Sequence, residues 1–157
     1  MTIRSKWYCY LLPLILWLSL FITGCHAPDG TRPGHEVRTV TDSQGTEIVV
    51  PVHPERVVSV GVSTDDVLIP LLGTKRIAAI AELMPNLEKE SEEIKGRISG
   101  STESVLQYAP DLVVVPSWKS AEYADEIRSA GIPVYVYQMP VTTEKIIGMI
   151  HELADLV

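Results

Sequence analysis

Four short apolar runs follow one another along the chain, and the stretches between them carry the signals of helices and turns. The runs occupy residues 57–60, 76–81, 112–115 and 134–137, and they are apolar nearly throughout rather than alternating with polar residues. Strands of this kind are buried on both faces, which is typical of a parallel sheet covered by helices. The sequence therefore predicts an α/β fold of three layers with a central, mainly parallel sheet and right-handed crossovers.

Helix signals separate these runs. We expect helices over residues 63–72, 101–108 and 120–130, and a last helix from about residue 142 to the end. Hydroxyl side chains stand where N-caps are needed, and the candidates are Ser63 or Thr64, Ser101 or Thr102, Ser120, and Thr142 or Thr143. Gly73 and Gly131 are the expected helix stops. The charged stretch 86–95 is expected to be a loop or a short helix.

A small β-hairpin is expected before the sheet. Residues 37–41 and 47–50 contain alternating β-forming residues, and they flank a turn at 42–46 that contains Gly45. Pro51 and Pro54 are expected to end the pairing because proline cannot donate a ladder hydrogen bond.

The first 24 residues have the pattern of an export signal. Arg4 and Lys6 precede an uncharged run over residues 7–22, and Thr23 and Gly24 follow it. A membrane-spanning helix usually needs about 20 apolar residues. Because the run is shorter and contains Pro13, a permanent span is the weaker alternative.

Residues 21–25 read FITGC and resemble a bacterial lipobox. This predicts cleavage before Cys25, lipidation of its thiol, and anchoring of the protein at the extracytoplasmic face of the cell membrane. The alternative is a buried free cysteine at the end of an apolar segment. Residues 25–36 contain Pro and Gly but no large apolar residue, so a flexible tether is expected there.

Charge and motifs exclude several functions. The chain has 13 Lys and Arg against 20 Asp and Glu, a formal net charge of −7, which disfavours a nucleic-acid partner. The sequence lacks a GxSxG elbow, HExxH, a P-loop and GxGxxG. It therefore predicts neither an enzyme nor a resident cofactor or metal ion.

A candidate binding surface follows from the fold class, because ligands of open α/β sheets bind outside the carboxyl ends of the strands. Hydroxyls at helix N-termini suit oxygen-rich or anionic groups, and Trp and Met offer apolar contact. Together these suit a bulky amphipathic ligand. The alternative is that Trp118 covers the sheet edge and the methionines fill gaps. The candidate ligand-binding residues are Ser63, Thr64, Glu82, Met84, Ser101, Trp118 and Gln138.

The last helix is expected to bury one apolar face and to continue beyond the sequence. No Gly, Asn or Pro stop follows it, which favours a truncated helix over a docked terminal helix that frays. The residues expected on the apolar face are Ile146, Ile147, Ile150, Leu153, Ala154 and Val157.

Several motifs in this order resemble the iron-siderophore and cobalamin substrate-binding proteins of ABC importers. They are DSQG at 42–45, PERVVS at 54–59, STD at 63–65 with LG at 72–73, YAPDLV at 108–113 and AGIPV at 130–134. The resemblance covers residues 37–157 and implies two α/β lobes joined by a long helix, with the ligand held between them. Residues 37–141 would form the N-terminal lobe and residues 142–157 the start of the connecting helix, with the second lobe absent.

The resemblance also implies a function. The protein would be a lipid-anchored solute-binding component that delivers a ferric siderophore, haem or a corrinoid to an ABC permease and its ATPase, with any metal held inside the ligand. Glu103 matches a glutamate with which the family meets permease arginines, and Trp118 matches a loop that often presents an aromatic residue to the ligand. The family's glutamate on the second lobe has no counterpart. The alternative is a truncated lobe that acts only as a structural or interaction module.

Overall fold

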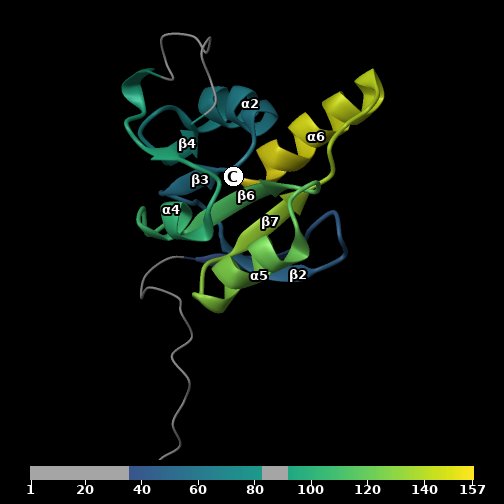
Figure 1. Cartoon of the computed structure of the whole chain (residues 1–157). Helices are drawn as coiled ribbons and strands as arrows, with labels where there is room; N and C mark the ends of the chain where they lie inside the picture. Colours follow the sequence, from purple (N-terminus) through teal and green to yellow (C-terminus); the bar gives the residue numbers. More distant parts are fainter. Residues whose placement is uncertain (1–35, 83–91) are drawn as a thin grey trace, which may run out of the picture. The chain divides into compact units, whose positions relative to one another are not determined.

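The computed structural model describes residues 36–82 and 92–157, which form a two-stranded hairpin and a five-stranded sheet with helices packed on it (Figure 1). The predicted α/β fold is confirmed. In chain order the elements are β1 (Val37–Thr41), β2 (Glu47–Pro51), β3 (Val57–Ser59), α2 (Val62–Leu72), β4 (Ile77–Ala81), β5 (Arg97–Ile98), α4 (Thr102–Leu106), β6 (Leu112–Pro116), α5 (Ala121–Ser129), β7 (Val134–Tyr137) and α6 (Thr143–Leu156).

The five strands of the main sheet are all parallel, in the order β5-β4-β3-β6-β7. From the central β3 the chain goes first to β4 and β5 on one side, and it then returns to build β6 and β7 on the other. The strand order therefore reverses between β3 and β6. In open α/β sheets such a switch point is where ligands bind, outside the carboxyl ends of the strands.

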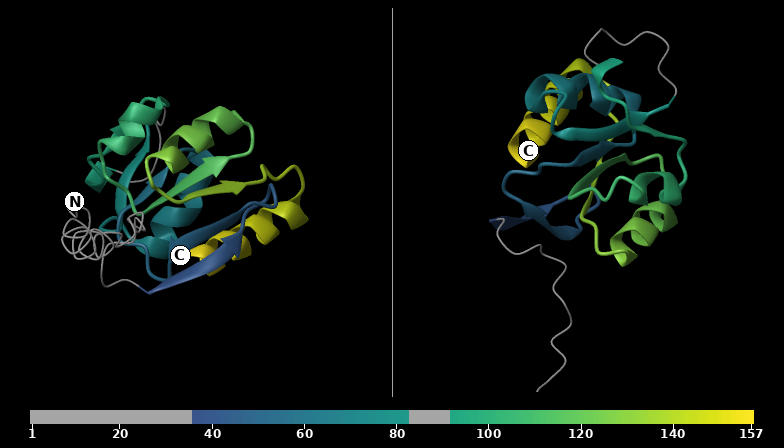
Figure 2. Two further views of the ribbon diagram at one scale, coloured as in Figure 1. Left: turned by 90° about the horizontal axis from the view of Figure 1, so that it is seen from below. Right: turned by 90° about the vertical axis from the view of Figure 1, so that its left-hand side faces the viewer.

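Helices cover both faces of the sheet (Figure 2). On one face, Leu68 of α2 and Leu153 of α6 pack in the same apolar cluster as Val57 of β3. On the other, Val105 of α4 and Ile127 of α5 pack in a cluster with strand residues that include Val58, Val113 and Val136. Successive strand residues point to opposite faces, and both faces are buried. This accounts for the continuously apolar runs.

Both outer strands of the sheet have backbone groups bonded to another part of the chain. At β7, the Ser43 amide and hydroxyl both donate to the Val136 carbonyl, at 3.0 and 2.7 Å. At β5, the Tyr108 hydroxyl accepts from the Arg97 amide at 3.0 Å and donates to its carbonyl at 3.1 Å. Occupied edges of this kind protect a sheet from pairing with another chain.

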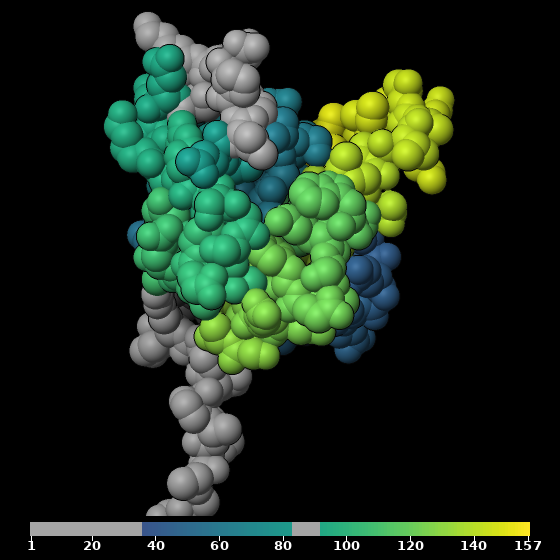
Figure 3. Space-filling view, viewed as in Figure 1, coloured from purple at the N-terminus to yellow at the C-terminus, as the bar shows by residue number. Residues whose placement is uncertain are grey.

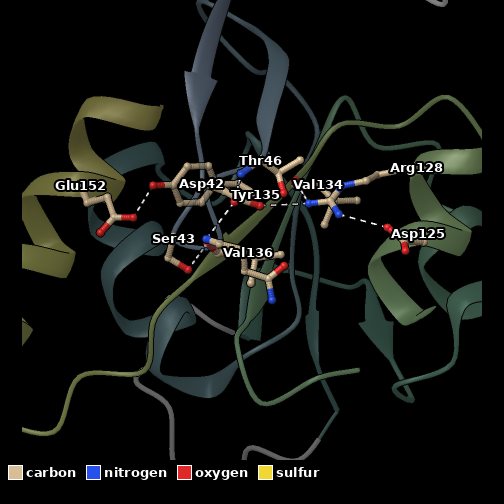
Figure 4. Close-up of polar contacts among 10 residues, drawn as sticks. Asp42, Ser43, Thr46, Asp125, Arg128, Val134, Tyr135, Val136 and Glu152 are labelled. Carbon is tan, nitrogen blue, oxygen red and sulfur yellow. Dashed lines mark hydrogen bonds and ion pairs between the residues drawn. The ribbon is translucent and has the colours of Figure 1, made fainter. Parts of the chain in front are cut away.

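Asp42 connects the hairpin to the main sheet and to α5 (Figure 4). One of its carboxylate oxygens accepts from the amides of Gln44 and Thr46, both at 2.9 Å, which shapes the hairpin turn. The other pairs with Arg128 at 3.0 Å, and the Asp42 side chain is fully buried. Arg128 also donates to the Val134 carbonyl and pairs with Asp125 on the surface.

The helix boundaries confirm most of the expected caps. Ser101, Ser120 and Thr142 cap α4, α5 and α6 through their hydroxyls, and Gly73 and Gly131 have the positive φ expected of helix stops. The expected cap of α2 is wrong, because α2 begins at Val62 with Gly61 as its N-cap. The two-residue strand β5 was not expected, and Pro51 lies inside β2, paired with Val37.

The expected apolar face of α6 is buried only in part: Leu153 is fully buried and Val157 packs against the core. The residues that α6 buries are Met149, Leu153 and Leu156, and the side chains of Ile146, Ile147 and Ile150 are 45%, 53% and 39% exposed. The helix meets the sheet and α2 with a face rotated from the one that its isoleucines mark. Figure 3 shows part of α6 projecting from the other described elements.

Residues 1–35 and 83–91 lie outside the described part of the chain. The predicted signal peptide, nearly all of the tether, Cys25 and Met84 fall there. Among the described helices none has the length and apolar character needed to cross a bilayer.

Asp42 and Asp125 both pair with Arg128, so substitutions at the two positions compare a buried ion pair with an exposed one. We expect Asp42→Ala to lower the free energy of unfolding by about 3 kcal/mol, since it removes the buried carboxylate that pairs with Arg128 and accepts two turn amides. Asp125 is 68% exposed, so Asp125→Ala should cost less than about 1 kcal/mol. Urea denaturation followed by circular dichroism measures both, and equal losses would show that burial does not set the value of the pair.

Candidate functional site

We use the name strand-end edge for the side of the sheet at which its parallel strands finish. Gly61, Glu82, Gly100, Ser117 and Gln138 follow β3, β4, β5, β6 and β7 within two residues. Because parallel strands all end on the same side, the loops that contain the predicted ligand-binding residues meet at one edge of the sheet. The described residues predicted for this surface are Ser63, Thr64, Glu82, Ser101, Trp118 and Gln138.

Side chains from β7 and α2 meet close to the switch point. The hydroxyls of Ser63 and Tyr137 are 3.0 Å apart, and the Ser63 hydroxyl lies 3.7 Å from the sulfur of Met139. The Ser117 hydroxyl accepts from the Met139 amide at 3.3 Å, which joins the loops after β6 and β7. A Cβ on Gly61 would lie 2.6 Å from the Tyr137 hydroxyl. Only glycine therefore fits at the end of β3 beside this tyrosine.

Thr64 does not face the strand-end edge. It is fully buried, and its hydroxyl lies 2.7 Å from the Ser59 hydroxyl and 2.5 Å from the Gly61 carbonyl. These bonds fasten the first turn of α2 to the end of β3. The other predicted residues are more accessible, since Glu82, Ser101 and Gln138 are exposed and Ser63 is half-buried.

Trp118 is the largest exposed side chain at this edge, with 63% of its surface in solvent. Beside it the Lys119 ammonium lies 5.4 Å from the Trp118 ring centre and 4.6 Å from that of Tyr123, and it donates to the Gly100 carbonyl at 3.2 Å. Sequence reasoning missed Lys119, although the spacing of Trp118, Lys119 and Tyr123 could have signalled cation–π contacts.

Asp65 is a buried carboxyl at the start of α2. It has no accessible surface, and neither of its oxygens has a hydrogen bond that meets ordinary geometry within residues 36–82 and 92–157. Burial raises the pKa of Asp65 to about 7, against smaller opposing effects of Ser59, the Ala81 backbone and Arg97.

The remaining predicted residues are placed as follows. Glu103 is exposed in the first turn of α4, and Met84 and Cys25 lie outside the described residues. In the parts of the chain that the structure describes, no three or more His, Cys, Asp or Glu side chains are grouped so that they could hold a metal ion.

The buried carboxyl makes the stability of the protein depend on pH. The pKa of Asp65 is about 7 in the folded protein against an ordinary value of 3.8, so folding favours the protonated form. The contribution of Asp65 to stability is therefore greatest below about pH 4 and is lost progressively up to about pH 7, by about 4 kcal/mol in all.

We expect Asp65→Asn, which keeps the shape and removes the charge, to raise the free energy of unfolding at pH 8 by a large part of that amount. Between pH 5 and pH 8 the variant should lose less stability than the unmodified chain in urea denaturation. Asp155→Asn, at an exposed position on α6, is the control and should leave the pH dependence unchanged. If the two variants respond to pH alike, Asp65 is not the titrating group.

The protein matches no protein-family model, and no curated protein matches it in sequence. Solved structures do match. The haem-binding protein HmuT superposes with a TM-score of 0.63 at 22% identity, over 83% of this chain and 43% of HmuT. CeuE of Helicobacter pylori superposes with a TM-score of 0.60 at 19% identity, over 77% of this chain and 42% of CeuE.

A third neighbour is the molybdate periplasmic binding protein MolA of a Haemophilus influenzae ABC transporter, with a TM-score of 0.56 and 21% identity over 76% of this chain and 46% of MolA. The chain thus spans less than half the length of each of these three structures. The resemblance found in the sequence is confirmed at the level of the fold: the described part of the chain shares the fold of one portion of HmuT, of CeuE and of the periplasmic binding protein MolA.

Proposed function

We propose that this chain provides the ligand-binding surface of one lobe of an extracytoplasmic solute-binding protein, which delivers an iron complex or a corrinoid to an ABC permease and its ATPase. The observation that carries the proposal is the largely exposed Trp118 at the carboxyl edge of a parallel sheet. An exposed indole costs solvation energy unless it serves contact with something else. The fold shared with haem-binding and molybdate-binding proteins supports the same function.

The side chains at the strand-end edge support the proposed ligand class. Trp118 offers a flat apolar surface, and Ser63, Ser101 and Gln138 offer hydrogen-bonding groups that are at least partly accessible. A ferric siderophore, haem or a corrinoid combines large apolar surfaces with polar groups at its rim, which suits such a lining. We place the metal inside the ligand, as the resemblance implies.

We further propose that residues 37–141 form the lobe and that α6 begins a helix leading to a second lobe. The support is the apolar face of α6, where Ile146, Ile147 and Ile150 leave 45%, 53% and 39% of their surface in solvent. A second lobe packed on this face would remove the isoleucines from water, at about 25 cal/mol for each Å² buried. Signal-peptide cleavage and lipidation of Cys25 complete the proposal and place the lobe outside the cytoplasmic membrane.

Ligand titration tests the binding function. In a chain with Trp7→Phe and Trp17→Phe, Trp118 is the sole tryptophan, and its fluorescence should fall on addition of a ferric tris-catecholate, haemin or cyanocobalamin. Trp118→Ala, followed by calorimetry, should weaken the binding about fivefold, because stacking on one aromatic ring contributes on the order of 1 kcal/mol.

Val49→Ala, which trims another exposed apolar side chain on β2, is the matched control and should bind normally. If none of the three ligands quenches Trp118, the binding function is wrong, and a lobe with only a structural or interaction role becomes the better account.

Transport tests the proposed docking residue. Glu103→Arg should abolish uptake in cells that contain the whole importer and leave ligand binding unchanged, because a carboxylate that pairs with permease arginines would be replaced by a like charge. Glu122, exposed in the first turn of α5, supplies the control variant Glu122→Arg. Equal uptake by the two variants would assign docking to another surface.

A further inference from the structure

Lys119 connects three segments of the strand-end edge. Its own loop follows β6, its ammonium donates to the carbonyl of Gly100 in the loop between β5 and α4, and the ring of Tyr123 lies 4.6 Å from that ammonium in α5. The same ammonium lies 5.4 Å from the centre of the Trp118 ring. A single half-buried ammonium thus joins two loops, one helix and the exposed indole.

The surroundings of the ammonium are shaped to hold it. Gly100 has a φ of +91°, and a Cβ at this position would lie 3.3 Å from the Lys119 nitrogen. A side chain there would be both strained and crowded against the cation. Tyr123 is largely buried, and burial raises the pKa of its hydroxyl to about 12. Its ring therefore stays neutral, with an electron-rich face suited to a cation.

We propose that Lys119 is the positioning residue of this surface: its ammonium, anchored on the Gly100 carbonyl and the Tyr123 ring, holds the indole of Trp118 in one orientation at the strand-end edge and makes the surface favour flat anionic ligands over cationic ones. An indole fixed before binding loses less side-chain entropy when a ligand stacks on it. The exposure of Trp118 is then compatible with a rigid contact surface.

The charge preference is a consequence of the same contact and rests on the proposed function. A flat ligand that stacks on Trp118 comes within several ångströms of the Lys119 ammonium, where opposite charges attract even near a protein surface. The chain as a whole carries a net charge of −7, which by itself attracts cations. A preference for anions would therefore have to come from the Lys119 ammonium, because the net charge of the chain has the opposite effect.

Time-resolved fluorescence anisotropy tests the positioning without any ligand. In the full chain with Trp7→Phe and Trp17→Phe, we expect Lys119→Met to raise the amplitude of the fast depolarisation of Trp118 roughly twofold, because a released exposed side chain reorients on the ps–ns timescale. Lys119→Arg keeps a cation and should restore the slow decay. Lys75→Met, at an exposed lysine elsewhere in the chain, is the control.

The melting temperature shows whether a variant loosens Trp118 alone or destabilises the whole fold. We expect it to be the same in all these variants. An unchanged fast amplitude in Lys119→Met overturns the positioning role. So does an equal rise in Lys119→Arg, since the cation would then not be the cause.

Two porphyrins with the same ring and opposite peripheral charge test the ligand preference. One carries four sulfonatophenyl groups and the other four N-methylpyridinium groups, and both are titrated in 150 mM salt, where the Debye length is about 8 Å and long-range charge effects are screened. The unmodified chain should bind the anionic porphyrin at least about tenfold more tightly. Lys119→Met should lose this preference and Lys119→Arg should keep it.

Tighter binding of the cationic porphyrin by the unmodified chain would overturn the charge preference. If neither porphyrin binds, the charge preference fails together with the binding function for porphyrin-like ligands, whereas the anisotropy result decides the positioning role on its own.

Discussion

Burial of the parallel strands between two helical layers decides where polar chemistry can occur in this protein. The central strands β3 and β6 are buried along their whole length, so their side chains can only be apolar or internally bonded. Polar groups that are to meet a ligand are therefore displaced to the loops at the strand ends. The outer strands β7 and β5 also have backbone groups at their edges that need partners. Ser43 bonds to the backbone of β7, and the Tyr108 hydroxyl bonds to the backbone of β5.

Two buried aspartates, Asp42 and Asp65, differ in whether the protein supplies partners for their carboxyl groups. Asp42 has two backbone donors and the Arg128 guanidinium, so its charge is compensated and the hairpin is held to the sheet. Asp65 is equally buried but has no comparable partner among the described residues, and its pKa rises to about 7. Burial costs free energy unless hydrogen bonds or an opposite charge offset it. Only the first aspartate is therefore an anchor.

Much of the fold could be predicted because its signals are local. The apolar runs, the hydroxyl N-caps at Ser101, Ser120 and Thr142, and the glycine stops each depend on a few consecutive residues. The two-residue strand β5 is too short to carry a pattern. The buried face of α6 could not be read from its isoleucines, because burial is set by where the helix meets the sheet and α2.

The position of the candidate residues in the fold was predictable in outline, and their contacts were not. Parallel topology fixes which loops meet, so the strand-end edge and the exposed Trp118 agree with expectation. The internal use of the Thr64 hydroxyl and the contacts of the Lys119 ammonium depend on distances between segments, which no local pattern contains. The packing of Gly61 against Tyr137 is a further contact of this kind. Since even one methyl group on Gly61 would overlap the tyrosine hydroxyl, the residue at each of these two positions limits what the other can be. A lineage that gains alanine at 61 should also exchange the tyrosine at 137 for phenylalanine or a smaller residue.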